Sequence, residues 1–221
     1  PRGPDPSLRL TEWGSHEEWG WVMGRGLQQR WQKWWNRTVP CGLLGFLLVA
    51  MPSPGMAASL EGVTFPDSIH AGSVTLPLRG VGLAKFMRTI SLYVAALYLP
   101  SALEPDRVLD DVPKRLELSY FRSIRRAEFG RAATKVLADN VPPETLSILA
   151  PRIEQMHRLY EDVKPGDRYG LTYLPGVGTE LALNGVVKGT VEGADFAAAY
   201  FAIWLGPDPI NQALKARLLN R

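Results

Sequence analysis

After residue 58, hydrophobic and polar positions follow two different periodicities, and each periodicity occupies separate blocks of the chain. Alternation with a period of two, as in "KRLELSYF" at 114–121, is typical of a strand with one buried face. Apolar positions spaced at 3.6 residues, as in "ADFAAAYFAIWLG" at 194–206, indicate an amphipathic helix. The blocks run strands, helices, strands, helices, which favours an α+β fold with an antiparallel sheet over a βαβ fold.

The alternating pattern predicts strands over 62–66, 73–80, 83–100, 114–121, 167–176, 179–185 and 186–193. The helical spacing predicts helices over 104–111, 123–140, 142–163, 194–206 and 209–220. Ser123 is a plausible N-cap, and Pro151 should bend or split its helix. The triplet "GVG" occurs at 80–82 and 176–178, and because neither copy precedes a helix we interpret both as turns, not phosphate loops.

The first quarter of the chain is a different kind of sequence from the rest. Six of the seven tryptophans precede residue 36, and the only cysteine is Cys41. From Met23 onward come basic residues without an acid, then about a dozen mostly apolar residues, then small residues, which is the layout of a secretory signal peptide. The apolar run is shorter than the roughly 20 residues of a membrane span. We therefore expect a signal peptide over 23–58, cleaved after Ala57 or Ala58, and an exported, periplasmic protein.

Residues 1–22 fit neither part, because they mix acids with tryptophans and begin with Pro. We interpret them as a non-native or mis-called upstream segment and residues 59–221 as one domain. This domain has 19 Lys and Arg against 18 Asp and Glu, so its charge does not favour a nucleic-acid partner. A membrane contact is expected only through the leader, if that segment stays uncleaved.

Few residues of the domain carry recognisable chemistry. His70 and His157 lie 87 positions apart, outside any metal-ligand spacing, and no G-x-S-x-G or cysteine nucleophile is present, so we expect no metal, no cofactor and no hydrolase site. The cluster Arg122, Arg125, Arg126, Arg131 and Lys135 is most simply a solvated face, with an anionic partner as the alternative. A buried tyrosine hydroxyl needs a partner or a cavity, which directs attention to Tyr93 in the apolar stretch 90–100. Along an even strand, Lys85, Thr89 and Tyr93 would share one face.

Several stretches in order make the domain resemble the chalcone isomerase-like family, in its bacterial branch. They are "GVTFPDS", "LRGVGLAKF" with "LYVAALYLP", "PKRLEL", "DRYGLTYLPGVGTELALNG" and the segment from "GTVEGADF" to "IWLGPDPI". The resemblance implies an open-faced sandwich, a large antiparallel sheet with helices on one face and a ligand cleft between them.

The resemblance leaves the activity open. Of the family's isomerase residues, the arginine aligns with Lys85, two threonines with Tyr93 and Ile203, the tyrosine near Phe129 and the asparagine near Val136, so only the positive charge is kept. No catalytic residue is therefore assigned. An isomerase, or intramolecular lyase, acting on a chalcone-like or conjugated substrate remains the alternative.

Fatty-acid-binding relatives are the closer parallel, because they hold a carboxylate with a cation and a tyrosine. The resemblance then implies a non-catalytic binder of a fatty acid or similar small apolar acid. Its predicted ligand-binding residues are Lys85, Tyr93, Thr89, Phe129, Val136, Ile203 and Trp204. If the alignment of Lys85 with the family's arginine is shifted, Arg79 or Arg88 would supply the positive charge instead.

Overall fold

The computed structural model describes residues 57–221 except Arg88. The segment 1–22 and nearly all of the predicted signal peptide 23–58 lie outside the described residues, so their expected roles stay predictions. Among the described residues, no helix is both long enough and apolar enough to cross a membrane.

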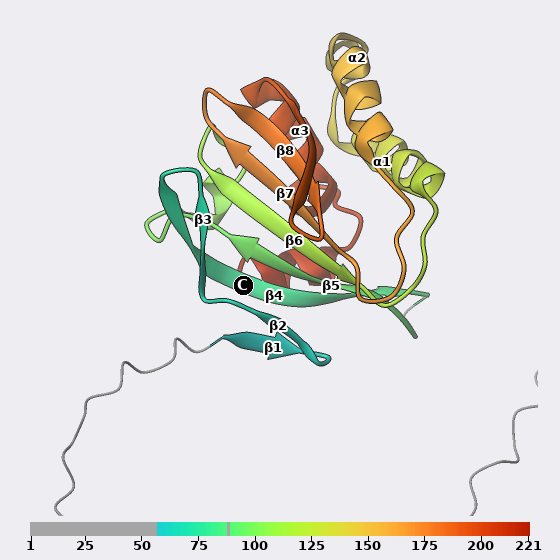
Figure 1. Cartoon of the computed structure of the whole chain (residues 1–221). Coiled ribbons are helices and arrows are strands. Elements are labelled where there is room, and N and C mark those ends of the chain that lie inside the picture. Colours follow the sequence, from blue (N-terminus) through green and yellow to red (C-terminus); the bar gives the residue numbers. More distant parts are fainter. Residues whose placement is uncertain (1–56, 88) are drawn as a thin grey trace, which may run out of the picture. The chain divides into compact units, whose positions relative to one another are not determined.

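Seven strands form one antiparallel sheet in simple chain order (Figure 1). They are β3 (Ser68–Ala71), β4 (Val74–Phe86), β5 (Ile90–Tyr98), β6 (Lys114–Tyr120), β7 (Arg168–Leu174), β8 (Gly178–Leu183) and β9 (Val186–Val191). The sheet is curled, and every neighbouring pair is joined by a hairpin or by a longer connection that returns to the adjacent position. Two further short strands, β1 (Ala58–Leu60) and β2 (Val63–Phe65), form a separate hairpin.

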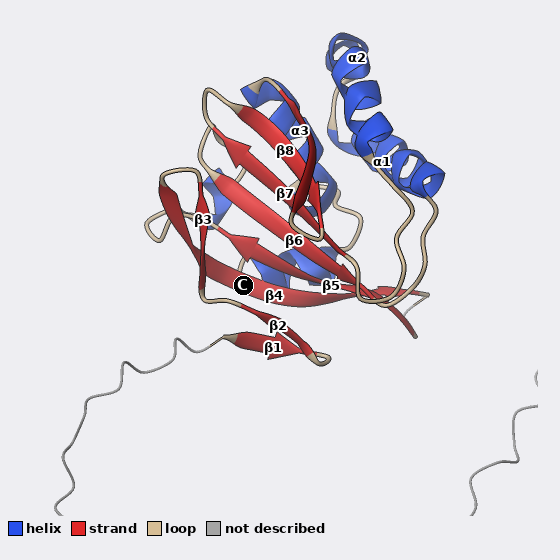
Figure 2. Cartoon of the chain, in the orientation of Figure 1, coloured by secondary structure: helices blue, strands red, loops and turns tan. Residues whose placement is uncertain are grey.

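The helices gather on one face of the sheet (Figure 2). A short 3-10 turn, η1 (Pro105–Arg107), precedes β6, and the α-helices are α1 (Arg126–Asn140), α2 (Pro143–Leu159), α3 (Ala194–Leu205) and α4 (Gln212–Leu218). The expected N-cap at Ser123 is wrong, because α1 starts later and its first amide, of Arg126, donates to Asp162 of the α2–β7 loop at 2.8 Å. Pro151 does not split its helix, since α2 runs through that residue, and the expected bend stays a prediction.

The alternation of side chains along each strand divides the interior into two clusters. The larger lies between the sheet and the helices, and includes Ala95, Leu97, Leu118 and Leu171. The smaller lies on the opposite face, where the β1–β2 hairpin packs Phe65 against β3, β4 and β5. The predicted α+β open-faced sandwich is confirmed, and the hairpin on the second face is the part that was not foreseen.

Two errors in the strand predictions have clear physical causes. The stretch 83–100 is two strands, because the chain turns back after Phe86 with Met87 at a positive φ of 48°, although the turn has no glycine or proline. The first "GVG" lies inside β4, not in a turn. A Cβ atom at Gly80 would lie 2.3 Å from the Arg217 carbonyl oxygen, so glycine there allows α4 to pack directly on the strand.

Candidate functional site: a tyrosine-lined cavity

A cavity of about 520 Å³ lies between the sheet and the helices. Its walls come from β5, β6, β7 and β8 on one side and from α1, α3 and the segment after α2 on the other. Most of the lining is apolar, but it includes five tyrosines: Tyr93, Tyr120, Tyr160, Tyr169 and Tyr200. A cavity of this size and composition is typical of a site for a small, largely apolar ligand.

The sheet positions three of these rings side by side. Tyr93 of β5 lies directly opposite Tyr120 of β6, with ring centroids 5.6 Å apart, and Tyr169 of β7 packs edge-on to Tyr120 at 6.1 Å. From the helical side, the ring of Phe129 stacks on Tyr160 at 4.8 Å and contacts Tyr169 edge-on at 5.5 Å. The rings fix one another, so the hydroxyls at their ends are held in place before any ligand binds.

The hydroxyls differ in how far the protein satisfies them. The Tyr169 hydroxyl accepts from the Glu161 amide at 2.7 Å and donates to the Glu161 carbonyl at 3.0 Å, so both of its roles are used. Tyr93 accepts from the Trp204 indole N–H at 3.2 Å, and Tyr200 donates to Tyr160 at 3.1 Å.

Three O–H groups are therefore free to donate. The hydroxyls of Tyr93 and Tyr160 act as acceptors in these bonds, and neither donates to any other described residue. The Tyr120 hydroxyl donates to no described residue, and it is not among the fully enclosed unpartnered atoms of the described residues, in keeping with its place on the cavity lining. Because each of the three O–H groups can donate to an acceptor placed in the cavity, they favour a ligand that brings an acceptor oxygen.

Burial keeps these phenols neutral. It raises the pKa of Tyr93 to about 12, although the indole hydrogen bond from Trp204 lowers it. The pKa of Tyr120 lies well above its usual range, first because the ring is buried and then because the hydroxyls of Tyr160, Tyr93 and Tyr169 lie nearby. At neutral pH the cavity therefore offers uncharged hydrogen-bond donors and no phenolate that could act as a base or nucleophile.

Among the described residues that line the cavity, none is a cation. The remaining polar residues of the lining are Ser123, in the segment before α1, and Glu128, in the first turn of α1. Glu128 pairs with Arg125 at 3.3 Å and with Arg131 at 3.7 Å, and both arginine side chains are largely exposed. The exposed residues of the lining, Ser123, Ala132 and Ile210, mark the mouth of the cavity, and the two arginines lie outside the lining, next to Glu128.

Comparison with known proteins identifies the fold. A family model described as chalcone isomerase-like matches residues 57–220. The chain belongs to the chalcone isomerase-like family. No curated protein matches it significantly. Among solved structures, a fatty-acid binding protein of Arabidopsis thaliana is similar in fold, with a TM-score of 0.59 and 16% sequence identity, over 74% of this chain and 96% of that one.

Four of the seven predicted ligand-binding residues line the cavity of this chalcone isomerase-like domain: Tyr93, Phe129, Ile203 and Trp204. Val136 is buried in the same core but is not part of the lining. Whether the four contact a ligand stays a prediction.

The expected placement of Lys85 and Thr89 in the cavity is wrong. Both side chains are exposed. Ala84, not Lys85, lies opposite Tyr93, and a bulge at Leu92 then pairs Lys85 with Ser91. Thr89 lies in the turn, where its hydroxyl donates to the Met87 carbonyl at 3.4 Å. The prediction assumed one even strand from 83 to 100, whereas the turn and the bulge break the shared face that it required.

Of the two alternative cations, only Arg79 lies among the described residues. Arg79 does not line the cavity, and its Nε is buried without a partner among the described residues. Arg88 lies outside the described residues.

Sequence reasoning missed Tyr120, Tyr160, Tyr169 and Tyr200 as site residues. A signal existed for two of them. Tyr120 follows Leu116 and Leu118 on the buried side of an alternating strand, and Tyr200 lies on the apolar face of the helix at 194–206. No local pattern brings Tyr160 to them, because its place after α2 is set by tertiary packing.

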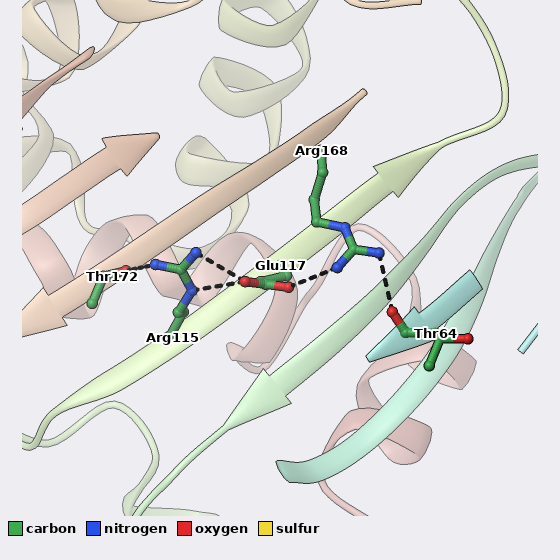
Figure 3. Close-up of polar contacts among 5 residues, drawn as sticks. All are labelled: Thr64, Arg115, Glu117, Arg168 and Thr172. Carbon is green, nitrogen blue, oxygen red and sulfur yellow. Dashed lines mark hydrogen bonds and ion pairs between the residues drawn. The ribbon is translucent and has the colours of Figure 1, made fainter. Parts of the chain in front are cut away.

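The opposite face of the sheet carries a closed ionic network (Figure 3). Glu117 of β6, nearly buried, accepts from Arg115 through one carboxylate oxygen at 2.9 and 3.0 Å and from Arg168 of β7 through the other at 3.3 Å. Arg115 also donates to the Thr172 hydroxyl at 2.7 Å, and Arg168 donates to the Thr64 carbonyl of the β1–β2 hairpin at 3.2 Å. This network joins the strands β2, β6 and β7.

No group of three or more potential metal ligands occurs anywhere among the described residues.

Proposed function

We propose that this protein is a non-catalytic binder of a fatty acid or similar small apolar acid, held in the tyrosine-lined cavity. The observation that carries the proposal is the combination of an apolar enclosure with three hydroxyl donors that have no acceptor in the described protein. The similar solved structure is that of a fatty-acid binding protein, which supports the same class of ligand.

The cavity favours the acid in its uncharged form. A carboxylate moved into an apolar enclosure loses its hydration, and only a paired cation or several strong donors offset that cost. The lining has neutral phenols and no cation among its described residues. We infer that the ligand's carbonyl oxygen accepts from Tyr120 and its neighbours, while the hydrocarbon part contacts the walls at Leu118, Leu171 and Ile203.

The test compares an acid with its ester. The purified protein, stripped of lipid, is titrated with palmitic acid and with methyl palmitate between pH 5 and pH 9. If the acid binds uncharged, its affinity falls about tenfold per pH unit above the pKa of the acid, while the affinity of the ester stays constant. Affinity for the acid that rises with pH, or that does not change, contradicts binding in the uncharged form.

A cavity-filling variant tests the location. Ala133 of α1 is buried and lines the cavity, so Ala133→Trp should occupy the ligand's space and abolish binding of both compounds. Ala182→Trp serves as the matched control, because Ala182 is buried on β8 but is not part of the lining. Each variant is first checked for an intact fold by circular dichroism, and Leu replaces Trp at both positions if a Trp variant does not fold. Unchanged binding in a folded Ala133 variant would remove the cavity as the site.

We further propose that the protein is exported after cleavage of the leader at 23–58. The support is the order of basic, apolar and small residues, together with the family match that begins at residue 57. A cut after Ala57 would leave the first strand, Ala58–Leu60, complete, whereas a cut after Ala58 would remove the residue that pairs with Phe65. The intact mass of the protein isolated from the periplasm decides between them, and a mass that retains residues 23–57 contradicts cleavage.

A further inference from the structure

The end of the sheet that carries the cavity mouth also carries a cluster of exposed positive charges. We define the basic rim as the exposed side chains of Arg122, Arg125, Arg126, Arg131 and Lys135. Between positions 122 and 135 the only acidic residue is Glu128, and the Asp162 carboxylate also lies at the rim, where it accepts from the Arg126 amide at 2.8 Å, so cations outnumber acids here. Such an imbalance is local, because the domain as a whole is nearly neutral.

The rim is attached to the cavity by direct contacts. Glu128 lines the cavity and is the residue with which Arg125 and Arg131 pair. Within α1, positions 128, 129, 132 and 133 line the cavity, so the helix presents one side to the ligand space and holds the two arginines beside its opening. Ser123, which also lines the cavity, follows Arg122 directly.

Exposed apolar side chains lie at the same end of the sheet. Met87 is 75% exposed and Ile90 is 41% exposed, and both belong to the β4–β5 hairpin. The Phe121 amide donates to the Leu92 carbonyl at 2.9 Å, which places the start of β5 beside the segment that leads into α1. Ile210, 44% exposed, lines the cavity from the other side. Exposed apolar residues among cations are typical of proteins that bind a membrane surface.

We propose that this end of the molecule docks on a bilayer containing anionic lipids, with the cavity mouth facing the lipid. The choice of a lipid surface over another polyanion rests on the proposed function, because a lipid ligand would leave and enter the membrane at this opening. The cations would contact phosphate headgroups, and Met87 and Ile90 would enter the interfacial layer. This adds a membrane contact to the leader, which was the only one expected from the sequence.

Sedimentation with vesicles tests the docking. The protein as isolated is mixed with vesicles of phosphatidylcholine alone and with vesicles in which about a quarter of the lipid is phosphatidylglycerol. We expect binding that is roughly tenfold or more stronger to the anionic vesicles and that is lost as ionic strength approaches about 1 M, where screening leaves a Debye length of ~3 Å. Absence of binding, or equal binding to both vesicles, overturns the proposal.

Matched variants locate the contact. Arg131→Gln should weaken binding to the anionic vesicles about fivefold, whereas Arg107→Gln should change it by less than about twofold. The two arginines are comparable, since their side chains are 73% and 66% exposed and each forms an ion pair with one acid, but Arg107 belongs to η1 at the opposite end of the sheet. Because all variants share the N-terminal segment, the differences report on the rim alone.

Apolar residues give an independent pair. Met87→Ser should weaken vesicle binding severalfold, while Val177→Ser, at a residue 58% exposed in the β7–β8 turn at the opposite end, should not. Equal effects of the two members in both pairs contradict docking through the rim. The outcome is separable from the proposed function: palmitic acid binding in solution without vesicle binding removes only the docking, and vesicle binding without ligand binding removes only the carrier role.

Discussion

The two faces of the seven-stranded sheet treat buried polar groups in opposite ways. On the helical face the polar groups are neutral tyrosine hydroxyls, and three of them have hydrogens with no acceptor in the described protein. On the other face the charged groups Arg115, Glu117 and Arg168 satisfy one another, while the neutral Tyr98 hydroxyl is enclosed without a partner among the described residues. Charges that satisfy one another contribute structure, whereas free donors that border a cavity are available for a ligand.

The difference between the two faces is present within a single strand. Along β6, Leu116, Leu118 and Tyr120 face the helices, while Arg115 and Glu117 face the opposite side. Since consecutive side chains of a strand point to opposite faces, the same short segment supplies both the cavity wall and the ionic network. A one-residue shift of register would exchange the two sets, so the network also helps to fix which face lines the cavity.

Breaking the network should have the largest effect on stability. Glu117→Gln keeps the shape of the side chain but leaves two partly buried arginines without a counter-charge, so we expect a loss of about 3 kcal/mol in the free energy of unfolding. Glu128→Gln removes two exposed ion pairs and should cost less than about 1 kcal/mol. Urea denaturation measures both. Ligand affinity of the folded Glu117→Gln protein should be unchanged, and equal losses of stability would contradict the contrast.

Lys114 is an exception on the helical face, because it is a buried charged residue among neutral ones. Lys114, at the end of β6 remote from the cavity, is fully buried. Its ammonium group donates to the Asp110 carbonyl at 2.7 Å and lies 4.9 Å from the ring centre of Tyr173 and 5.6 Å from that of Phe201. Burial lowers the pKa of Lys114 from 10.5 to about 8, although nearby Asp111 and Asp110 raise it.

This lysine predicts how stability depends on pH. Between pH 8 and pH 10 the unfolded chain keeps the lysine proton while the folded protein releases it, so stability should rise with pH in this range. The rise should end near pH 10, where tyrosines ionise in the unfolded chain, because burial holds the pKa of Tyr93 at about 12 in the folded protein.

Lys114→Met should remove the rise and stabilise the protein below pH 8, by up to about 3 kcal/mol from the shift in pKa. Urea midpoints measured at unit steps from pH 7 to pH 10 check this, with Lys135→Met, at an exposed lysine, as the control that keeps the rise. A Lys114→Met protein that retains the same pH dependence would show that another group causes it.

Local pattern predicted the fold well and the site only in part. Alternation and helical spacing located most strands and helices of the domain, because each has one face in the core. The short strands β1 and β3 were not predicted, and the helix expected over 104–111 is only the 3-10 turn η1. The turn at Met87 was missed because it lacks the usual turn residues, and this error moved Lys85 onto the wrong face. Tyr93 was found because its hydroxyl lies in an apolar stretch, and Trp204 because of the family resemblance. Their hydrogen bond joins residues 111 positions apart and follows only from the tertiary fold.

The sharpest test of the contrast uses two tyrosines that differ mainly in their face. Tyr120 on the helical face and Tyr98 on the other are both buried side chains, but only the Tyr98 hydroxyl is fully enclosed without a hydrogen-bond partner among the described residues. The pKa of Tyr98 is raised first by burial and then by the nearby Glu117 carboxylate. Only the Tyr120 hydroxyl borders the cavity, so the same change should have a different consequence at each position.

Tyr120→Phe should weaken binding of methyl palmitate about tenfold, because one donor to the ligand's carbonyl oxygen is lost, and should leave the free energy of unfolding nearly unchanged. Tyr98→Phe should leave binding unchanged and raise the free energy of unfolding by about 1 kcal/mol, because an unpaired hydroxyl is removed from the interior. Calorimetric titration and urea denaturation of both variants measure the four quantities. If Tyr98→Phe weakened binding as much as Tyr120→Phe, the two faces would not be functionally distinct, and free hydroxyl donors would no longer mark the ligand site.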